Sequence, residues 1–212
     1  MQSILLRKPS QALLIFTRNP EPGKCKTRLA ASIGDQSALD IYRFLLTHTA
    51  RIATEVQVAD KFVYFSEHVG DGSFWNPSVF HFRLQSGDEL GSRMRNAFQE
   101  AFTLGYTRVI IIGSDLYDLS PEDLQEAFER LDEHEVVLGP ASDGGYYLLG
   151  LQVLIPELFE NKAWGTDSVF EDTLKDLESS DTYVLPVRND VDRYEDIAGN
   201  PIFESIINRT DE

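Results

Sequence analysis

The sequence predicts an α/β fold in three layers, with a mostly parallel, mixed sheet covered by helices on both faces. Short apolar runs alternate with segments of helical apolar spacing along the 212 residues, which is typical of such folds. The run RVIIIG at 108–113 is the most apolar and predicts a central parallel strand that is buried on both faces. Because no repeat, low-complexity tract or linker interrupts this order, we expect one domain over residues 1–212.

The remaining strands are predicted from short apolar runs bounded by turn residues. ALLIF at 12–16 is such a run and predicts the first buried strand. Two more strands are expected at 61–66 and 79–85, with a loop of Gly, Asp, Asn and Pro between them. EVVLG at 135–139 and YYLLGL at 146–151 predict two further strands, separated by the turn-forming PASDGG.

Helices are predicted from apolar spacing and from residues that favour helix starts. We expect helices from about Thr27 and over 38–56, 88–102, 120–131 and 168–177. The fourth of these has Ser120 at the N-cap, Pro121 at the first helical position and Asp123 three residues after the cap. Ser168 and Glu171 have the spacing of a capping box at the start of the last one.

The composition excludes several classes of partner. The chain has 35 Asp plus Glu against 19 Lys plus Arg and a formal net charge of −16, which disfavours nucleic acid and anionic membrane surfaces. No apolar run approaches the roughly 20 residues of a membrane span. A single cysteine excludes an intrachain disulfide, and the N-terminal order of charged and apolar residues differs from that of a signal peptide. We therefore expect a cytoplasmic protein.

A short cationic loop, FTRNPEPGKCKTRL at 16–29, contrasts with this acidic background. It holds Arg18, Lys24, Lys26 and Arg28 against one acid, Glu21. The loop follows the first strand and precedes the first helix, where ligands bind in parallel sheets and where backbone N–H groups favour anions. The sequence therefore predicts a phosphate-binding loop; the alternative is a solvated loop whose cations offset the acidic body.

The glycine and prolines of this loop fit the same prediction. Gly23 would let the backbone approach a ligand closely, and Pro20 and Pro22 stiffen the loop. The loop is not a Walker A motif, because Arg18 stands where that motif needs glycine and Cys25 where it needs Ser or Thr.

Two carboxylates lie at turns that follow predicted strands. Asp115 comes directly after the central strand, where it could hold Mg²⁺ or Mn²⁺ against a diphosphate or simply cap a turn. Asp118 is expected to be a turn or helix-entry residue. Asp143 precedes Gly144 and Gly145, which either form a plain hairpin turn or leave room for a ligand whose hydroxyls the carboxylate binds.

The segment NDVDRYEDI at 189–197 contains four acids. Asp192 and Glu195 have capping-box spacing, which predicts that Asp192 is a helix cap. Asp190 has no such role and is expected to complete a metal site with Asp115. Asp196 is expected to face solvent or to cap locally.

Several other residues have a functional and a structural interpretation. Arg93 is either a second phosphate contact or a surface residue, and Trp164 is either a platform for a sugar or base or an aromatic packed under a loop. Cys25 lies among cations, but no motif supports a nucleophile. The histidines have no metal-ligand spacing: His48, His68, His81 and His134.

Taken together, six segments resemble a known family. They are RNPEPGKCKTRL, QSGDELGSRM, GSDLYDL, GPASDGGYYLLGL, WGTD and DVDRYEDI, and they occur in the same order between Leu13 and Ile197. The first and fourth are the most specific. The chain is similar to the bacterial GT-A-like transferases, also called selenodomain-associated transferases, which are distant kin of the molybdopterin-cofactor and phospholactate nucleotidyltransferases.

The resemblance implies a GT-A fold, a nucleotide or nucleotide-sugar donor and a divalent cation. By analogy, Lys26 and Arg28 meet the donor phosphates, and Asp115 and Asp190 meet the metal. The family usually has proline two residues after this first aspartate, and the chain has Tyr117 there, which implies a differently shaped loop.

The function expected from these features is a metal-dependent transferase, in the first place a glycosyltransferase acting on a small-molecule acceptor. The metal and Lys26 would stabilise charge on the leaving diphosphate, and Asp143 is the candidate base if stereochemistry is inverted. One alternative is a nucleotidyltransferase that releases pyrophosphate. Another is a nucleotide-binding module that has lost turnover, which Tyr117 favours and the retained aspartates oppose.

Overall fold

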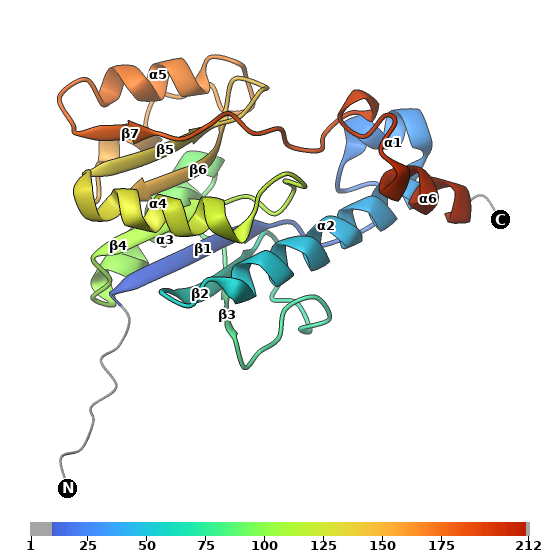
Figure 1. Ribbon diagram of the computed structural model, residues 1–212, viewed down its shortest axis with the longest axis horizontal. Helices are drawn as coiled ribbons and strands as arrows, with labels where there is room; N and C mark the ends of the chain where they lie inside the picture. Colours follow the sequence, from blue (N-terminus) through green and yellow to red (C-terminus); the bar gives the residue numbers. More distant parts are fainter. Residues whose placement is uncertain (1–9, 211–212) are drawn as a thin grey trace, which may run out of the picture.

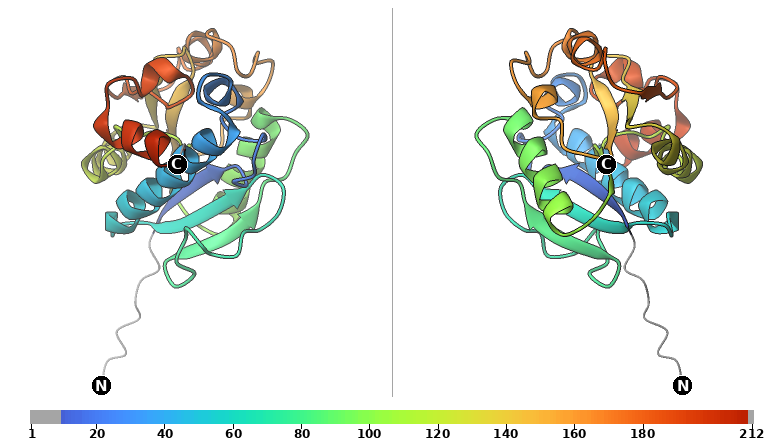
Figure 2. Two further views of the ribbon diagram at one scale, coloured as in Figure 1. Left: turned by 90° about the vertical axis from the view of Figure 1, so that its right-hand side faces the viewer. Right: turned by 90° about the vertical axis from the view of Figure 1, so that its left-hand side faces the viewer.

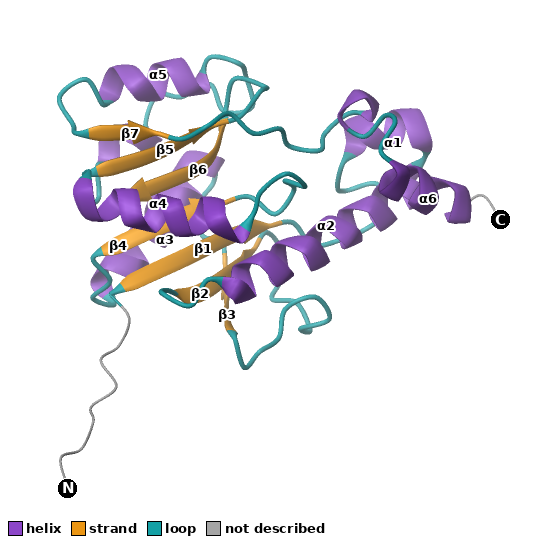
Figure 3. Cartoon of the chain, viewed as in Figure 1, coloured by secondary structure: helices purple, strands orange, loops and turns teal. Residues whose placement is uncertain are grey.

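The computed structural model describes residues 10–210, which form an α/β structure around one seven-stranded sheet (Figures 1 and 3). The strand order is β3-β2-β1-β4-β6-β5-β7, and β6 alone runs antiparallel to its neighbours. The strands are β1 (Gln11–Thr17), β2 (Asp60–Phe65), β3 (Phe80–Leu84), β4 (Arg108–Ile112), β5 (Val136–Pro140), β6 (Tyr146–Leu151) and β7 (Thr182–Val184). The predicted α/β class with a mostly parallel, mixed sheet is confirmed.

Six α-helices cover the sheet or extend beyond it in the described residues. They are α1 (Thr27–Ile33), α2 (Asp35–Glu55), α3 (Leu90–Thr103), α4 (Pro121–Glu133), α5 (Val169–Asp176) and α6 (Pro201–Thr210). Short 3₁₀ helices occupy Pro156–Phe159 and Tyr194–Asp196. Gly34 separates α1 from α2 and has a φ of 83°, a conformation that glycine adopts without steric cost.

Of the three capping boxes predicted from the sequence, those at α4 and α5 have different outcomes. At α4, Ser120 Oγ accepts the N–H of Asp123 and the Asp123 carboxylate accepts the N–H of Ser120, as predicted. At α5, Ser168 is the N-cap residue but has helical backbone angles and makes no side-chain cap bond, so the box with Glu171 is wrong. Its hydroxyl lies 3.2 Å from the hydroxyl of Thr166 instead.

The layers follow from the apolar runs of the strands. Leu13 and Ile15 of β1 pack in a cluster with α2 and α4, whereas Ala12 and Leu14 pack on the opposite face with α3. Alternate residues of a strand point to opposite faces, so a continuous apolar run is the expected composition of a doubly covered strand. The end-on views of Figure 2 show helices on both sides of the sheet.

A third apolar cluster joins α1, the first half of α2 and α6 at one end of the molecule, beyond the sheet (Figure 1). Tyr117 packs against this cluster, with ring centroids 5.0 Å from Phe203 and 5.9 Å from Phe44. The residue that departs from the family pattern therefore anchors the loop after β4 to the C-terminal helix. None of the described helices is long and apolar enough to span a membrane.

Candidate nucleotide and acceptor site

The candidate site lies where the sheet order reverses, at the carboxyl ends of β1 and β4. The chain leaves β1 through α1 and α2 toward β2, and returns through α3 to β4 on the other side of β1. Because these connections diverge to opposite faces of the sheet, they leave a crevice between the two strand ends.

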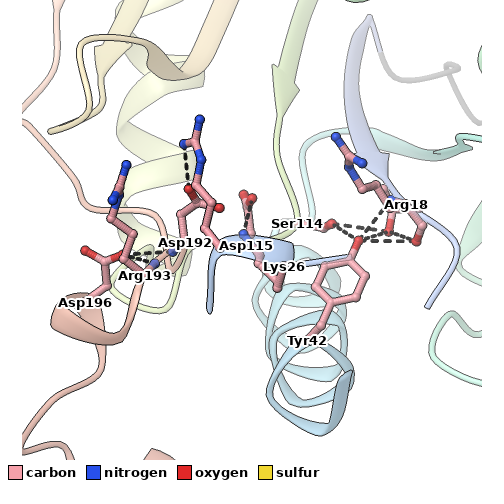
Figure 4. A network of polar contacts seen from close by, with 10 residues as sticks. Arg18, Lys26, Tyr42, Ser114, Asp115, Asp192, Arg193 and Asp196 are labelled. Atoms are coloured by element: carbon pink, nitrogen blue, oxygen red, sulfur yellow. Dashed lines mark hydrogen bonds and ion pairs between the residues drawn. The ribbon is translucent and has the colours of Figure 1, made fainter. Parts of the chain in front are cut away.

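A buried tyrosine fixes these two strand ends relative to each other. The hydroxyl of Tyr42, on α2, accepts the N–H of Arg18 at 2.9 Å and lies 3.1 Å from Thr17 Oγ1 and 3.2 Å from Ser114 Oγ (Figure 4). Burial raises the pKa of Tyr42, so its hydroxyl stays protonated at neutral pH. The loops that carry the cations and Asp115 thus start from one hydrogen-bonded node.

The cationic loop is also tied to the loop after β2. Asn19 is buried; its Oδ1 accepts the N–H of Glu67 at 3.0 Å, and its Nδ2 donates to the carbonyl of His68 at 2.9 Å. Cys25 is buried, and burial raises its pKa, which leaves it a packing residue rather than a nucleophile. Gly23 has a φ of 70° beside a turn in which Lys24 N–H donates to the carbonyl of Glu21.

Lys26 is the one cation of the loop whose side chain is buried. Its backbone has a φ of 51°, and its side chain is 7% exposed, with Nζ donating to Asp115 Oδ2 at 2.8 Å. Burial acts to lower the pKa of Lys26, but Asp115, Asp190 and Asp192 outweigh it, so the net pKa is raised and the ammonium stays charged. Figure 4 shows the Lys26 side chain next to that of Asp115.

The other cations of the loop are exposed. Lys24 Nζ pairs with Glu21 at 2.7 Å and with Glu67 at 3.3 Å. Arg28 Nη1 pairs with Asp192 at 2.9 Å. Exposed pairs of this kind contribute little to stability, so an incoming anion can replace their carboxylates at low cost.

Arg18 and Arg93 complete the basic wall. Arg18 is exposed at the mouth of the crevice. Arg93, on α3, donates from Nε to the carbonyl of Gly87 at 2.9 Å and lies 3.5 Å from Gln85 Oε1 through Nη1. These neutral partners orient the guanidinium without neutralising its charge.

The backbone places Asp115 beside Asp190. Leu116 forms an antiparallel bridge with Asp190, and the N–H of Val191 donates to the carbonyl of Asp115 at 3.0 Å. Burial raises the pKa of Asp190 from 3.8 to about 6, and the charges of Asp115 and Asp143 add to this effect while Lys26 opposes it. The structure therefore gathers more negative charge here than Lys26 balances.

Asp143 lies on the turn between β5 and β6, where its Oδ1 accepts the N–H of Gly145 at 2.9 Å. The neighbouring Gly144 has a φ of 88°, and a Cβ there would lie 2.3 Å from the carbonyl oxygen of Asp167. The missing side chain of Gly144 thus makes room for the 165–168 loop, not for a ligand.

In the C-terminal acidic segment, the residue that caps the short helix differs from the prediction. Asp196, rather than Asp192, caps the short helix: its Oδ2 accepts the N–H of Asp192 at 2.9 Å and that of Arg193 at 2.6 Å. The predicted Asp192–Glu195 box is therefore wrong, because a helix of only three residues brings Asp196 within reach of those N–H groups. Asp118 ties the loop after β4 to the same segment by accepting the N–H of Asn189 at 3.1 Å.

The side chains enclose two adjoining spaces. A polar cleft of about 870 Å³ lies over the cationic loop, and an apolar cavity of about 250 Å³ opens beside it. The predicted site residues that line the polar cleft are Arg18, Lys24, Lys26, Arg28, Arg93, Asp115, Asp143 and Asp190. Those three aspartates also line the apolar cavity, together with Gly145 and Trp164. Gly23 and Gly144 line neither space.

Trp164 is both packed and at the surface of the apolar cavity. Its indole lies against Gly91 of α3, where a Cβ would come within 2.7 Å of Nε1, and its ring is edge-on to Tyr146 at 6.5 Å. The two interpretations of Trp164 are therefore compatible, because packing fixes one edge of the ring while the cavity is lined by the same side chain.

Residues 49–166 match a family model described as "Uncharacterized protein conserved in bacteria (DUF2064)", which is more than half of the chain. The chain belongs to the DUF2064 family. A crystal structure from Desulfovibrio desulfuricans G20, described as a "putative nucleotide-diphospho-sugar transferase", is 30% identical, with a TM-score of 0.84 over 95% of both chains. No protein of curated function matched the sequence.

More distant structures share the fold of this DUF2064 protein. The inositol-1-phosphate CTP transferase from T. maritima is 14% identical, with a TM-score of 0.56 over 95% of this chain and 96% of that chain. Rv0371C from Mycobacterium tuberculosis H37Rv, in a complex with manganese, is 13% identical, with a TM-score of 0.52 over 93% and 97%. The fold is thus that of nucleotide-sugar transferases and nucleotidyltransferases.

Two places in the described part of the DUF2064 protein bring side chains that can bind a metal close together. Glu21, Glu67 and His68 have ligand atoms within 4.8 Å of one another, but the Lys24 ammonium bonds to both glutamates and already supplies their counter-charge. Asp115 and Asp190 fit a hard divalent cation better, because they adjoin the polar cleft and carry excess negative charge. Two carboxylates suffice where a bound diphosphate supplies further oxygens.

Sequence reasoning missed the Tyr42 node and the part played by Asp192 in the cleft. Tyr42 lies in the middle of an amphipathic helix, where an aromatic residue is ordinarily a core residue. Asp192 lines the polar cleft opposite Arg28, a contact between segments 164 residues apart that no local pattern indicates.

Proposed function

We propose that this DUF2064 protein is a metal-dependent glycosyltransferase that uses a nucleotide-sugar donor, with the whole chain acting as one domain. The observation that carries the proposal is the division of charge in the cleft: five cations line it, and three aspartates converge where it meets the apolar cavity. The name given to the Desulfovibrio relative supports the same chemistry.

The basic wall would bind the donor diphosphate. Arg18 and Arg93 face the cleft without an ion pair to a carboxylate among the described residues, and the exposed Lys24 and Arg28 would exchange their carboxylate partners for phosphate oxygens. Charge-assisted hydrogen bonds to phosphate are stronger than neutral ones and favour guanidinium groups.

Asp115 and Asp190 would hold Mg²⁺ or Mn²⁺ next to that diphosphate. When bound, such an ion supplies positive charge against the charge that develops on the leaving group. Lys26 would act on the same leaving group, because its ammonium, which donates to Asp115 in the structure, could instead donate to a phosphate oxygen. Its position at the junction of cleft and carboxylates makes it a catalytic residue of the proposed reaction.

Asp143 is the candidate base. It is exposed, lines both spaces and has one oxygen held by the N–H of Gly145, which orients the carboxylate. A carboxylate within hydrogen-bond reach of an acceptor hydroxyl takes its proton as the new bond forms. This role applies if the transfer inverts the sugar configuration.

A nucleotidyltransferase remains the second candidate, because distant structures with the same fold include a CTP transferase. Both reactions use the cationic loop and the carboxylates, and the released product distinguishes them: a nucleoside diphosphate for glycosyl transfer, pyrophosphate for nucleotidyl transfer. A module without turnover would bind nucleotide and release neither.

The proposal is tested by thermal shift with a panel of nucleotides and nucleotide sugars, with and without Mn²⁺. We expect a nucleotide sugar to raise Tm more strongly with Mn²⁺, and Asp115→Asn to weaken Mn²⁺-supported binding roughly 100-fold. Asp167→Asn is the matched control, because this exposed carboxylate lines neither space. If EDTA and Asp115→Asn both leave nucleotide affinity unchanged, the metal assignment is wrong.

A further inference from the structure

We infer that the apolar cavity binds the acceptor, and that this acceptor is an uncharged alcohol with a compact apolar body rather than a phosphorylated compound. That this ligand is the acceptor of a transfer reaction rests on the proposed function. The selectivity for an uncharged, apolar ligand rests on the cavity alone.

The walls of the cavity are apolar and come from four parts of the fold. Leu90 and Met94 belong to α3, Ile111 to β4 and Tyr146 to β6, and Trp164 precedes α5. The volume of about 250 Å³ suits a ring or a short branched chain. Burying such a group in this cavity is favourable in proportion to the apolar area removed from water.

The polar atoms of the aromatic walls do not turn this cavity into a polar site. The hydroxyl of Tyr146 donates to Met94 Sδ at 3.8 Å, a weak acceptor, and burial raises its pKa. The Trp164 indole nitrogen is buried against Gly91, without a hydrogen-bond partner among the described residues. The interior therefore offers mainly hydrocarbon, aromatic and sulfur surface.

The charged groups of the cavity are all negative. Among the described residues its lining includes Asp115, Asp143 and Asp190 but no Lys, Arg or His, whereas the adjoining cleft has five cations. Ionised carboxylates accept hydrogen bonds and donate none, so they suit a hydroxyl group and repel a phosphate. A hydroxyl at the mouth would lie beside Asp143, the candidate base.

This charge pattern separates the two candidate reactions. A phosphorylated acceptor, as in pyrophosphate-releasing nucleotidyl transfer, would find no Lys, Arg or His in the described lining of the cavity to bind its phosphate, and the carboxylate of Asp143 would lie beside that phosphate even when Asp115 and Asp190 hold the divalent cation. A neutral alcohol has no such cost, which favours glycosyl transfer to a hydroxyl.

The test uses benzyl alcohol and benzyl phosphate as a neutral and an anionic probe of the same shape. The chain has two tryptophans, and only Trp164 lines the cavity, while Trp75 is fully buried in another cluster. Titrations are followed by the two indole N–H resonances in a ¹⁵N–¹H spectrum, assigned with Trp164→Phe. We expect benzyl alcohol to shift the Trp164 resonance at concentrations at least ten-fold below those of benzyl phosphate, and the Trp75 resonance to stay in place.

A charge variant makes the test independent of probe shape. Thr166 is exposed and lines the cavity, so Thr166→Lys adds a cation at its mouth and Thr166→Gln adds similar bulk without charge. We expect Thr166→Lys to lower the Kd of benzyl phosphate at least five-fold and Thr166→Gln to leave it within two-fold.

Benzyl phosphate shifting Trp164 as readily as benzyl alcohol in the unchanged protein would overturn the inference, as would no shift with either probe at 50 mM. Nucleotide binding is measured separately by calorimetry. If the alcohol preference holds but no nucleotide or nucleotide sugar binds, the proposed function fails while the selectivity of the cavity stands. If nucleotide binding holds but the preference is absent, the inference alone fails.

Discussion

The basic wall and the carboxylate end of the cleft are built in opposite ways. Four of the five cations come from one contiguous loop at 16–29, and two of these four, Lys24 and Arg28, are exposed beside acids that balance them. The three aspartates come from segments far apart in the chain, and burial of Asp190, together with the charges of Asp115 and Asp143, raises the pKa of Asp190 to about 6. One region is assembled by sequence proximity and the other by the sheet.

Lys26 joins the two regions. It belongs to the loop by sequence, but its buried ammonium is bonded to Asp115 at the carboxylate end. In the absence of a ligand this lysine supplies part of the positive charge that the aspartates need. A metal would replace Lys26 as the partner of Asp115, and a diphosphate would replace Asp115 as the partner of Lys26. Binding at the carboxylate end would therefore be linked to binding at the basic wall.

The largest effect is expected from Lys26→Ala. Removing the buried ammonium should weaken nucleotide binding by about 1.5–3 kcal/mol, the range of a charge-assisted hydrogen bond. Calorimetry with a nucleoside diphosphate measures the loss directly. Lys26→Met retains the apolar stem, so an equal loss in both variants assigns the effect to the charge.

Lys24→Ala provides the comparison within the same loop. Its side chain is 55% exposed, and its ammonium is already shared between Glu21 and Glu67, so we expect a distinctly smaller loss of nucleotide affinity. Equal losses for Lys24→Ala and Lys26→Ala would show that the loop acts as a diffuse charge and that burial gives Lys26 no special role.

An intermediate effect is expected from Asp190→Asn, and here the sign depends on pH. The pKa of Asp190 in the folded chain, about 6, lies above the reference value of 3.8, so the folded state holds this proton more tightly than the unfolded state. Stability contributed by this group is therefore greatest below about pH 4 and falls as pH rises to about 6. Asparagine keeps a neutral side chain throughout.

Asp190→Asn should therefore raise the free energy of unfolding at pH 7.5 by about 1–2 kcal/mol and leave it nearly unchanged at pH 4. The full pKa difference corresponds to about 3 kcal/mol, which partial exposure and coupling to Asp115 reduce. Urea unfolding of both proteins at the two pH values measures the difference. The same variant should lose the Mn²⁺ enhancement of nucleotide binding. If Asp190→Asn is neither more stable at pH 7.5 nor impaired in metal binding, Asp190 is not part of the site.

The sequence was sufficient where local chemistry determines the structure. The apolar runs of β1 and β4, the Ser120–Asp123 box of α4 and the position of the cationic loop after β1 all follow from composition and spacing. The convergence of Asp115 with Asp190 was expected from the family resemblance, and the bridge between Leu116 and Asp190 shows the backbone pairing that produces it.

The sequence was insufficient where tertiary packing decides. The edge strand β7, with only three residues, and the helix α6 have patterns too short or too mixed to be predicted. The role of Gly144 depends on the backbone of Asp167, and that of Tyr117 on Phe203 from the far end of the chain. The division into a cationic cleft and a cation-free cavity also requires the three-dimensional arrangement, because both spaces share the same three aspartates.

The smallest effects concern the edge of the carboxylate end, where Asp192 and Asp196 lie four residues apart with different partners. Burial acts to raise the pKa of Asp196, but hydrogen bonds from Asn189 and from the N–H groups of Arg193 and Asp192 lower it overall. Asp196→Ala leaves these donors without their acceptor and should cost about 1 kcal/mol, as loss of a helix cap does. Asp192→Ala removes an exposed pair with Arg28 and should cost at most about 0.5 kcal/mol.

Urea unfolding at pH 7 and pH 3 separates the two aspartates. Because the folded pKa of Asp196 is depressed, its contribution is present above about pH 4 and is lost as pH falls through the folded value, so the deficit of Asp196→Ala should shrink at pH 3. Asp192→Ala should instead free Arg28, and nucleotide affinity should rise or stay constant because the guanidinium no longer has to leave a carboxylate. A larger stability loss for Asp192→Ala than for Asp196→Ala would show that Asp192 is the helix cap. It would also contradict the role of Asp192 as the partner of Arg28 that a phosphate displaces.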